Sequence, residues 1–407
     1  MYFFYYIPVR IDEELRKFPA ITYFCCFLCL AIFFGNRYYA GQLPVDFYNL
    51  IYIPGQSNLF IAMAAAFLHF GYLHLISNMV FLLVFGRYVE DRMGAVFYAI
   101  LFFSSSALGN VLQGLFNIHV LHQPDVGIIG ASGAISGILG AFAVRFYASR
   151  LEVAFWAFMP LQAYNRAGRV EIPALLAIAL WFVLQLVRGL VQAGGVASNV
   201  AYITHIAGFM WAVGLVLLVG EHRRAKIETI WRRAQRYVEK GEAYAAQGEL
   251  IDYLSLRPDD DNAVATLARA KIIVGDTKGA NENYRKACER LLRKKQRGRA
   301  EDLFREALHG FPNFVLSPGK HLDLAFGLER NLKHKLAIRA YENFARRYPL
   351  HKEAPFALLR SANLYWNTLD DIDEAARCYK KLIELYPDDE WVEFAREQVR
   401  LLSFGAV

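Results

Sequence analysis

The sequence predicts an all-α protein in two parts, a bundle of six transmembrane helices followed by a soluble solenoid of helical repeats. Three observations support this prediction. Long uncharged stretches are confined to the chain before about residue 220. The remainder mixes acidic and basic residues and has no stretch that could cross a bilayer. A weak repeat with offsets of 37 and 38 residues runs through that second part.

Six segments have the roughly 20 apolar residues that a helix needs to cross the hydrocarbon core. They lie at about residues 19–35, 66–86, 94–116, 129–147, 172–193 and 200–220. The domains predicted from this division are a cytoplasmic N-terminal segment at 1–18, a transmembrane domain at 19–221 and a repeat domain at 228–407. The N-terminal segment has acidic residues and no cleavage-site pattern, so we expect no removable signal peptide.

Charge and cysteine content argue against several classes of function. The net charge of +7 arises from basic residues in short loops and on mixed-charge helices, a distribution that does not indicate nucleic-acid binding. None of the five cysteines has metal-ligand spacing with histidine, and no HExxH motif occurs. We therefore expect no metal and no cofactor, and we place the cysteines in the core or against lipid.

The positive charges of the loops predict the orientation in the membrane. They cluster in the N-terminal segment, after the second and fourth apolar segments, and behind the sixth: Arg10, Arg16, Lys17, Arg87, Arg92, Arg145, Arg150, Arg166, Arg169, Arg223 and Arg224. The loops at 117–128 and 192–199 have no lysine or arginine. Both termini should therefore be cytoplasmic, and the second, fourth and sixth segments should each begin at the opposite face.

Four polar residues then fall at a similar depth near that opposite face. Ser132 opens the fourth segment, His205 lies near the start of the sixth, and His74 and Asn78 lie in the first half of the second. Polar side chains in lipid are costly and usually face the bundle interior. Their common depth predicts a site formed by all four.

The residue types at this depth suit nucleophilic catalysis. A serine becomes a nucleophile when a histidine can take its proton. Ser132 stands between Gly130 and Gly133 at a loop-to-helix junction, where free backbone N–H groups and the helix dipole can stabilise an oxyanion. His74 and Asn78 are four residues apart, so they share one helix face, and both can donate hydrogen bonds.

Small residues predict that the fourth and sixth segments pack closely, which would bring His205 towards Ser132. In the fourth segment they are Gly133, Ser136, Gly137 and Gly140, and in the sixth Ala201, Gly208 and Ala212.

These motifs resemble those of the rhomboid intramembrane proteases over about residues 5–220. The matching motifs are GASG at 130–133, HxxxN at His74–Asn78 and HxxG at His205–Gly208. The resemblance implies a catalytic dyad of Ser132 and His205, with an oxyanion site formed by His74, Asn78 and the Ser132 N–H. It also implies that the substrates are transmembrane proteins, which are cut in or near a membrane helix.

The sequence departs from the family pattern at two points. Many members carry Trp-Arg in the first loop, and this chain has no such pair between Asn36 and Met63. Many also have an aromatic residue four positions after the serine, stacked on the histidine, where this chain has Ser136. Two further polar residues have simpler interpretations: we expect His69 to be structural and Asp125 to be a solvated loop acid, although Asp125 is also a candidate for orienting His205.

The second part resembles tetratricopeptide repeats, whose usual period is about 34 residues. Arg339-Ala340-Tyr341 leading to Tyr348-Pro349 matches Arg377-Cys378-Tyr379 leading to Tyr386-Pro387, an offset of 38 residues, and Phe304 with Phe311-Pro312 aligns at an offset of 37. Such repeats bind proteins or peptides on a concave face, which predicts a protein partner. A solubilising or dimerising appendage is the alternative.

The sequence therefore predicts a multi-pass enzyme of a bacterial cytoplasmic membrane, in contact with the lipid bilayer. One alternative is a proteolytically inactive relative that holds client helices as a scaffold, which the presence of both Ser132 and His205 disfavours. A small-solute transporter would need an internal repeat and broken helices near mid-membrane, and the sequence shows neither.

Overall fold

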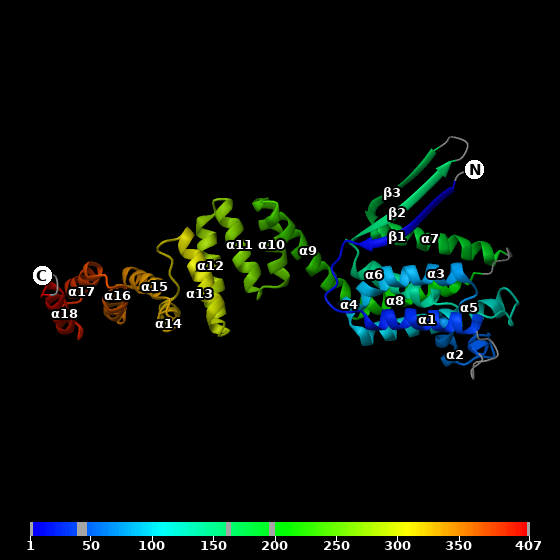
Figure 1. Cartoon of the computed structure of the whole chain (residues 1–407), viewed down its shortest axis with the longest axis horizontal. Helices are drawn as coiled ribbons and strands as arrows, with labels where there is room; N and C mark the ends of the chain where they lie inside the picture. The colour runs from blue at the N-terminus through cyan, green and yellow to red at the C-terminus, as the bar shows by residue number, and fades with distance from the viewer. Residues whose placement is uncertain (1–2, 39–46, 160–163, 195–199, 405–407) are drawn as a thin grey trace. The chain divides into compact units, whose positions relative to one another are not determined.

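The computed structural model describes residues 3–38, 47–159, 164–194 and 200–404, which belong to two compact units (Figure 1). One unit is Met1–Lys226 and the other is Ile227–Val407. The predicted, mostly helical architecture is confirmed. The first unit also contains a three-stranded sheet that the sequence analysis did not predict.

The first unit is a helical bundle in which α6 is the central helix. Its helices are α1 (Ala20–Tyr38), α2 (Leu59–Ala64), α3 (Tyr72–Phe81), α4 (Arg87–Met93), α5 (Ala95–His119), α6 (Ser132–Arg145), α7 (Ala174–Ala193) and α8 (Tyr202–Leu218). A π turn, η3 (Leu82–Gly86), joins α3 to α4, and short 3-10 turns, η1 (Phe47–Leu50) and η2 (Ala65–Phe67), flank α2. Residues 133–142 of α6 are all buried, because this helix packs against both α5 and α8.

Four helices of the described residues are long and apolar enough to cross a membrane: Ala20–Tyr38, Tyr72–Met93, Ala95–His119 and Ala174–Ala193. A fifth is added if α8 and α9 (Glu221–Glu239), which meet at a bend of 75°, are taken as one broken span. The apolar helix α6 has only 14 residues. Each of the six predicted segments overlaps one of these helices, and the number of crossings stays a prediction.

The sheet is antiparallel with the order β1-β2-β3, and its central strand begins shortly after the last residue of α6 (Figure 1). Its strands are β1 (Phe3–Ile11), β2 (Arg150–Met159) and β3 (Tyr164–Pro173). Leu151 pairs with both Ile11 and Ile172, while on the other face Glu152 forms ion pairs with Arg10 at 3.3 Å and Arg169 at 3.0 Å. This alternation of apolar and charged residues is the pattern of a half-buried strand.

Charged side chains at the same end of the bundle are buried and paired. The carboxylate of Glu90 accepts hydrogen bonds from the N–H of Ile21 at 2.9 Å and of Thr22 at 2.7 Å, and so caps the start of α1. Arg145, the last residue of α6, forms an ion pair of 2.9 Å with Glu221, and each side chain is about 5% exposed. Because buried charges are costly when unpaired, these contacts fix the ends of α1 and α6.

The second unit is a stack of antiparallel helices in which consecutive helices pack together. After α9 come α10 (Ala243–Leu256), α11 (Asp261–Ile273), α12 (Thr277–Arg293), α13 (Arg297–Gly310), α14 (Pro318–Arg330), α15 (His334–Arg347), α16 (Ala354–Leu369), α17 (Ile372–Leu385) and α18 (Val392–Phe404). The aromatic positions of the sequence repeat, Phe304, Tyr341 and Tyr379, are all fully buried. The repeat pattern therefore marks equivalent core positions of successive helical hairpins.

The tyrosines that precede proline link neighbouring repeats. The hydroxyl of Tyr348 donates to the carbonyl of Leu316 at 2.7 Å, and that of Tyr386 donates to the carbonyl of Pro349 at 3.0 Å. Between Pro258 and Pro312 the chain forms three helices, α11 to α13, instead of two. This additional helix explains why the sequence repeat is irregular there.

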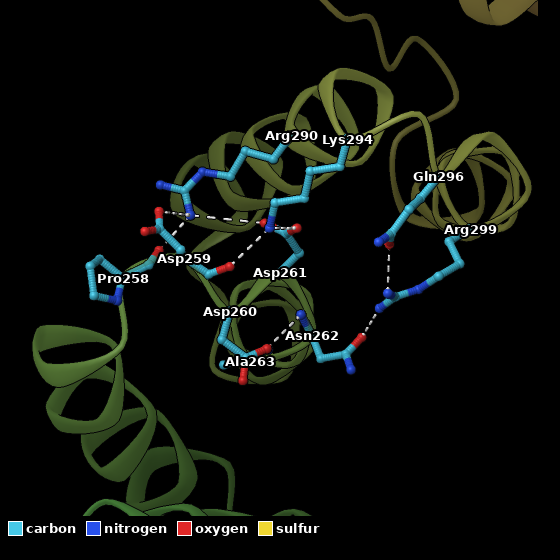
Figure 2. Close-up of polar contacts among 10 residues, drawn as sticks. All are labelled: Pro258, Asp259, Asp260, Asp261, Asn262, Ala263, Arg290, Lys294, Gln296 and Arg299. Carbon is cyan, nitrogen blue, oxygen red and sulfur yellow. Dashed lines mark hydrogen bonds and ion pairs between the residues drawn. The ribbon is translucent and has the colours of Figure 1, made fainter.

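A polar network holds the first turn of α11 to α12 and α13 (Figure 2). The side chain of Asp260 caps α11 by accepting hydrogen bonds from the N–H groups of Asn262 and Ala263. The buried carboxylate of Asp261 pairs with Lys294 at 2.6 Å, near the end of α12. These contacts stabilise the irregular part of the stack.

Candidate active site

Ser132 is the first residue of α6, and the chain reaches it through a glycine that no other residue could replace easily. Gly130 has a φ of +115°, a backbone conformation that side chains disfavour. Its N–H donates to the carbonyl of Ala65 at 2.9 Å. A Cβ added at Gly130 would lie 2.7 Å from Cε1 of His74. Both the backbone angle and the available space therefore require glycine at position 130, two residues before Ser132.

Glycines also let α6 and α8 approach to backbone contact, as the small residues of the two segments predicted. A Cβ at Gly208 would run into the carbonyl of Gly133, and one at Gly140 would run into the carbonyl of Phe209. Such contacts allow membrane helices to pack closely. The first turns of α6 and α8 are therefore neighbours.

This packing brings Ser132 and His205 into hydrogen-bond contact, although they are 73 residues apart in sequence. Nε2 of His205 lies 2.8 Å from Oγ of Ser132. On the other side of the ring, Nδ1 lies 2.9 Å from Oε1 of Gln185, a buried residue of α7. The imidazole ring is thus held between a hydroxyl group and a carboxamide group.

His74 and Asn78 face the same place from α3. A Cβ built on Gly130 would lie 2.8 Å from Nε2 of His74 and 3.9 Å from Oγ of Ser132, so the imidazole and the hydroxyl flank one point. Nδ2 of Asn78 is buried and has no hydrogen-bond partner in the part of the chain that the structure describes. A buried donor without a partner is costly and is available to a ligand.

All four residues line one cavity of about 1090 Å³. Its other lining residues include the carboxamides of Gln113, Asn117 and Gln192 and the rings of Phe70, Phe81 and Trp181. None of the described residues that line it carries a formal charge. The cavity therefore offers hydrogen bonds and apolar surface, which suit an uncharged stretch of polypeptide.

The remaining residues that the sequence analysis singled out are Asp125, His69 and Ser136, and none of them belongs to the dyad. Asp125 is exposed, and its carboxylate lies 3.4 Å from the side-chain amide nitrogen of Gln56. This position fits a solvated loop acid and not a residue that orients His205. The ring of His69 packs edge-on against the ring of His74 at 5.0 Å. Ser136, where many relatives have an aromatic residue, donates its hydroxyl hydrogen to the carbonyl of Ser132 at 2.6 Å.

Sequence reasoning missed Gln185. The available signal was the pair of glutamines, Gln185 and Gln192, in an otherwise apolar segment whose only charged residue is Arg188. Both are buried, as expected of polar residues that face a bundle interior. Only the fold shows that Gln185 meets His205.

Comparison with known proteins finds a family model that matches the part of the chain that holds this site. The model of the Rhomboid domain matches residues 56–222, a range that holds Ser132, His205, His74 and Asn78. This part of the chain is similar to a rhomboid domain. A tetratricopeptide repeat model matches residues 356–389, which cover most of α16 and all of α17. The predicted resemblance to both families is confirmed.

The chain is similar to parts of curated rhomboid-like proteins. It is 31% identical to "Rhomboid-like protease 3" of Toxoplasma gondii over 113 residues, which are 27% of this chain and 41% of that protein. It is 28% identical to "RHOMBOID-like protein 1" of Arabidopsis thaliana over 155 residues, which are 37% of this chain and 33% of that protein. The chain thus spans less than half the length of each of these relatives.

Solved structures with low overall similarity come from tetratricopeptide repeat proteins. One is YrrB, described as a TPR protein with an unusual peptide-binding site, with 15% identity, a TM-score of 0.21, and coverage of 40% of this chain and 88% of that chain. Another is a thermophilic TPR protein of Thermus thermophilus, with 19% identity, a TM-score of 0.19, and coverage of 44% of this chain and 99% of that chain.

Proposed function

We propose that this integral membrane protein is an intramembrane serine endopeptidase that cuts transmembrane proteins in or near a membrane helix. Ser132 is the nucleophile and His205 is the general base. The observation that carries this proposal is the 2.8 Å contact between Nε2 of His205 and Oγ of Ser132 at the N-terminus of α6. A nucleophile in hydrogen-bond contact with its base, beside a positive helix end, is the arrangement that acyl transfer needs.

The reaction follows from this geometry. Nε2 of His205 takes the proton of the Ser132 hydroxyl while Oγ attacks the carbonyl carbon of the scissile peptide bond. The oxyanion is stabilised by the Ser132 N–H, by His74 and by the unpartnered Nδ2 of Asn78. His205 then gives its proton to the leaving amine, and a water molecule, activated by the same ring, hydrolyses the acyl-enzyme.

Gly130, Gly133 and Gly208 support this site without touching the substrate. Gly130 leaves room for the His74 ring beside Ser132, while Gly208 and Gly133 let the two catalytic helices meet. The uncharged cavity accepts an unwound part of a membrane helix, because the exposed peptide groups of such a segment need hydrogen-bond partners in a region that lacks bulk water.

We further propose that the site opens to the non-cytoplasmic face of a bacterial cytoplasmic membrane and that both termini are cytoplasmic. The loop charges support this orientation. The repeat unit then lies in the cytoplasm, where it binds a protein partner such as the tail of a substrate or a regulator. Deleting residues 228–407 should leave the cleavage of a substrate without a cytoplasmic tail intact, and loss of that cleavage in a folded truncated protein would contradict this role.

Cleavage of a transmembrane reporter peptide in liposomes tests the enzymatic proposal. The wild-type chain should cut the reporter, and the Ser132→Ala and His205→Ala variants should not, although both remain folded. If Ser132→Ala still cuts, the site is wrong. If the folded wild-type chain cuts no member of a varied panel of helices, the inactive scaffold is the better description, and binding of the uncut helices would support it.

A further inference from the structure

Helix α7 packs on the bundle through a narrow stripe of residues. Only five of its 20 residues are buried: Ala174, Ile178, Gln185, Gly189 and Gln192. Most of the other residues are exposed and apolar, as on a helix that faces lipid. A glutamine in such a stripe must find a hydrogen-bond partner, because an unpaired carboxamide in an apolar environment costs several kcal/mol, on the order of 2–7.

The partner of Gln185 is the ring of His205. Oε1 of Gln185 lies 2.9 Å from Nδ1, and the side chain of Gln185 is buried. A carbonyl oxygen only accepts hydrogen bonds, so this contact assigns the ring proton to Nδ1. The lone pair of a neutral ring is then on Nε2, the atom that lies 2.8 Å from Oγ of Ser132. This is the tautomer that a general base requires.

No carboxylate takes this role in the described part of the chain. The hydrogen bonds of the His205 ring go to Ser132 and Gln185, and the rings of Trp181, at 6.2 Å, and Tyr202, at 6.4 Å, also lie near it. Ser136, which replaces the aromatic support of many relatives, bonds to the backbone of α6 instead.

We propose that Gln185 is a positioning residue of the reaction, which sets the tautomer and the orientation of His205 from α7. This inference rests on the proposed protease function and adds a third member to the dyad, in the place where serine proteases with a triad have a carboxylate. A carboxamide orients the ring without adding a charge, so no buried anion needs to be stabilised within the membrane.

The consequence is a selective loss of turnover when the acceptor is removed. Gln185→Met keeps the length of the side chain but has no hydrogen-bond acceptor of comparable strength. We expect it to lower kcat about 10- to 100-fold, the range seen when a partner that orients a metal-bound histidine is removed, with KM within about twofold. Gln185→Glu restores an acceptor of the same length and should bring kcat back to within about threefold of wild type.

The assay uses the full-length chain in liposomes, with the transmembrane reporter and with a fluorophosphonate that labels an activated serine. Ile178→Ala is the matched control, because Ile178 lies in the same buried stripe two turns before Gln185 and loosening it disturbs the packing of α7 alone. This control should lower Tm and keep kcat within about threefold of wild type, since it leaves the hydrogen bond to His205 in place. Gln185→Met should lower both kcat and the rate of labelling.

Each outcome has one meaning. A folded Gln185→Met variant with wild-type kcat would overturn the positioning role, and so would a Gln185→Glu variant that is as slow as Gln185→Met. In both cases Ser132→Ala and His205→Ala would still be inactive, and the proposed function would stand. A wild-type chain that neither cuts nor labels would overturn both proposals.

Discussion

The replacement of Gly208 by alanine tests how closely catalysis depends on the packing of α6 against α8. Gly208 lies one turn after His205 on α8, and its neighbour Gly133 follows Ser132 on α6. A Cβ at Gly208 would fall inside 3.0 Å of the carbonyl oxygen of Gly133, where ordinary contacts lie at 3.4 Å or more. Because that oxygen belongs to the backbone, the two helices must separate by at least 0.4 Å.

This separation would stretch the contact between His205 and Ser132 from 2.8 Å to 3.2 Å or more. A misplacement of about 1 Å at a reacting group costs roughly 100-fold in rate. We therefore expect Gly208→Ala to lower kcat about tenfold or more while the protein stays folded.

The assay is cleavage of the transmembrane reporter in liposomes, with Tm measured on the same preparation. Gly214→Ala is the control on the same helix, because a Cβ there meets nothing within 4 Å. It should retain wild-type kcat, since it exchanges glycine for a better helix former without a clash. Equal kcat for Gly208→Ala and the wild-type chain, with α8 intact, would refute the idea that this contact sets the geometry of the dyad.

Three further predictions concern stability. His321 of α14 accepts a hydrogen bond from the N–H of Leu316 and contacts the carbonyl of Ala340 at 2.8 Å, and burial lowers its pKa from 6.5 to about 4. The unfolded chain thus binds the proton more readily than the folded chain. As the pH falls from 6.5 to 4, α14 and α15 should therefore lose up to about 3 kcal/mol of stability. Hydrogen exchange in these helices that does not depend on pH in this window, after correction for intrinsic rates, would contradict this. Arg145→Ala leaves the buried carboxylate of Glu221 with its ion pair to Arg224 at 2.6 Å, so it should cost about 1–3 kcal/mol in a thermal unfolding assay, and a Tm unchanged from wild type would exclude this. Phe304→Ala opens a cavity in the core of the repeat unit and should lower its free energy of unfolding by about 3–5 kcal/mol, measured by urea unfolding followed by the fluorescence of that unit. A decrease below about 1 kcal/mol would mean that the surrounding side chains collapse into the cavity.

The sequence predicted those features that local patterns encode. Apolar length marked the helices, and the offset of 38 residues marked Tyr341 and Tyr379 as equivalent core positions. The polar residues Ser132 and His205 stood out in apolar segments, and the loop charges predicted a common depth for them. Such inferences are possible because the helical period and the cost of burying polar groups act over a few residues and need no knowledge of which segments meet.

The tertiary structure decided which segments meet. The alternation that marks β2 and its neighbour β3 was missed in the sequence, and β1 could not be assigned from local pattern because it joins the sheet by pairing with β2, more than 130 residues away. The role of Gln185 was not predicted because its partner is 20 residues away on another helix, at an angle that only the packing of α7 on α8 fixes. A hydrogen bond depends on distance and direction within tenths of an ångström, and the sequence specifies these only through the complete fold.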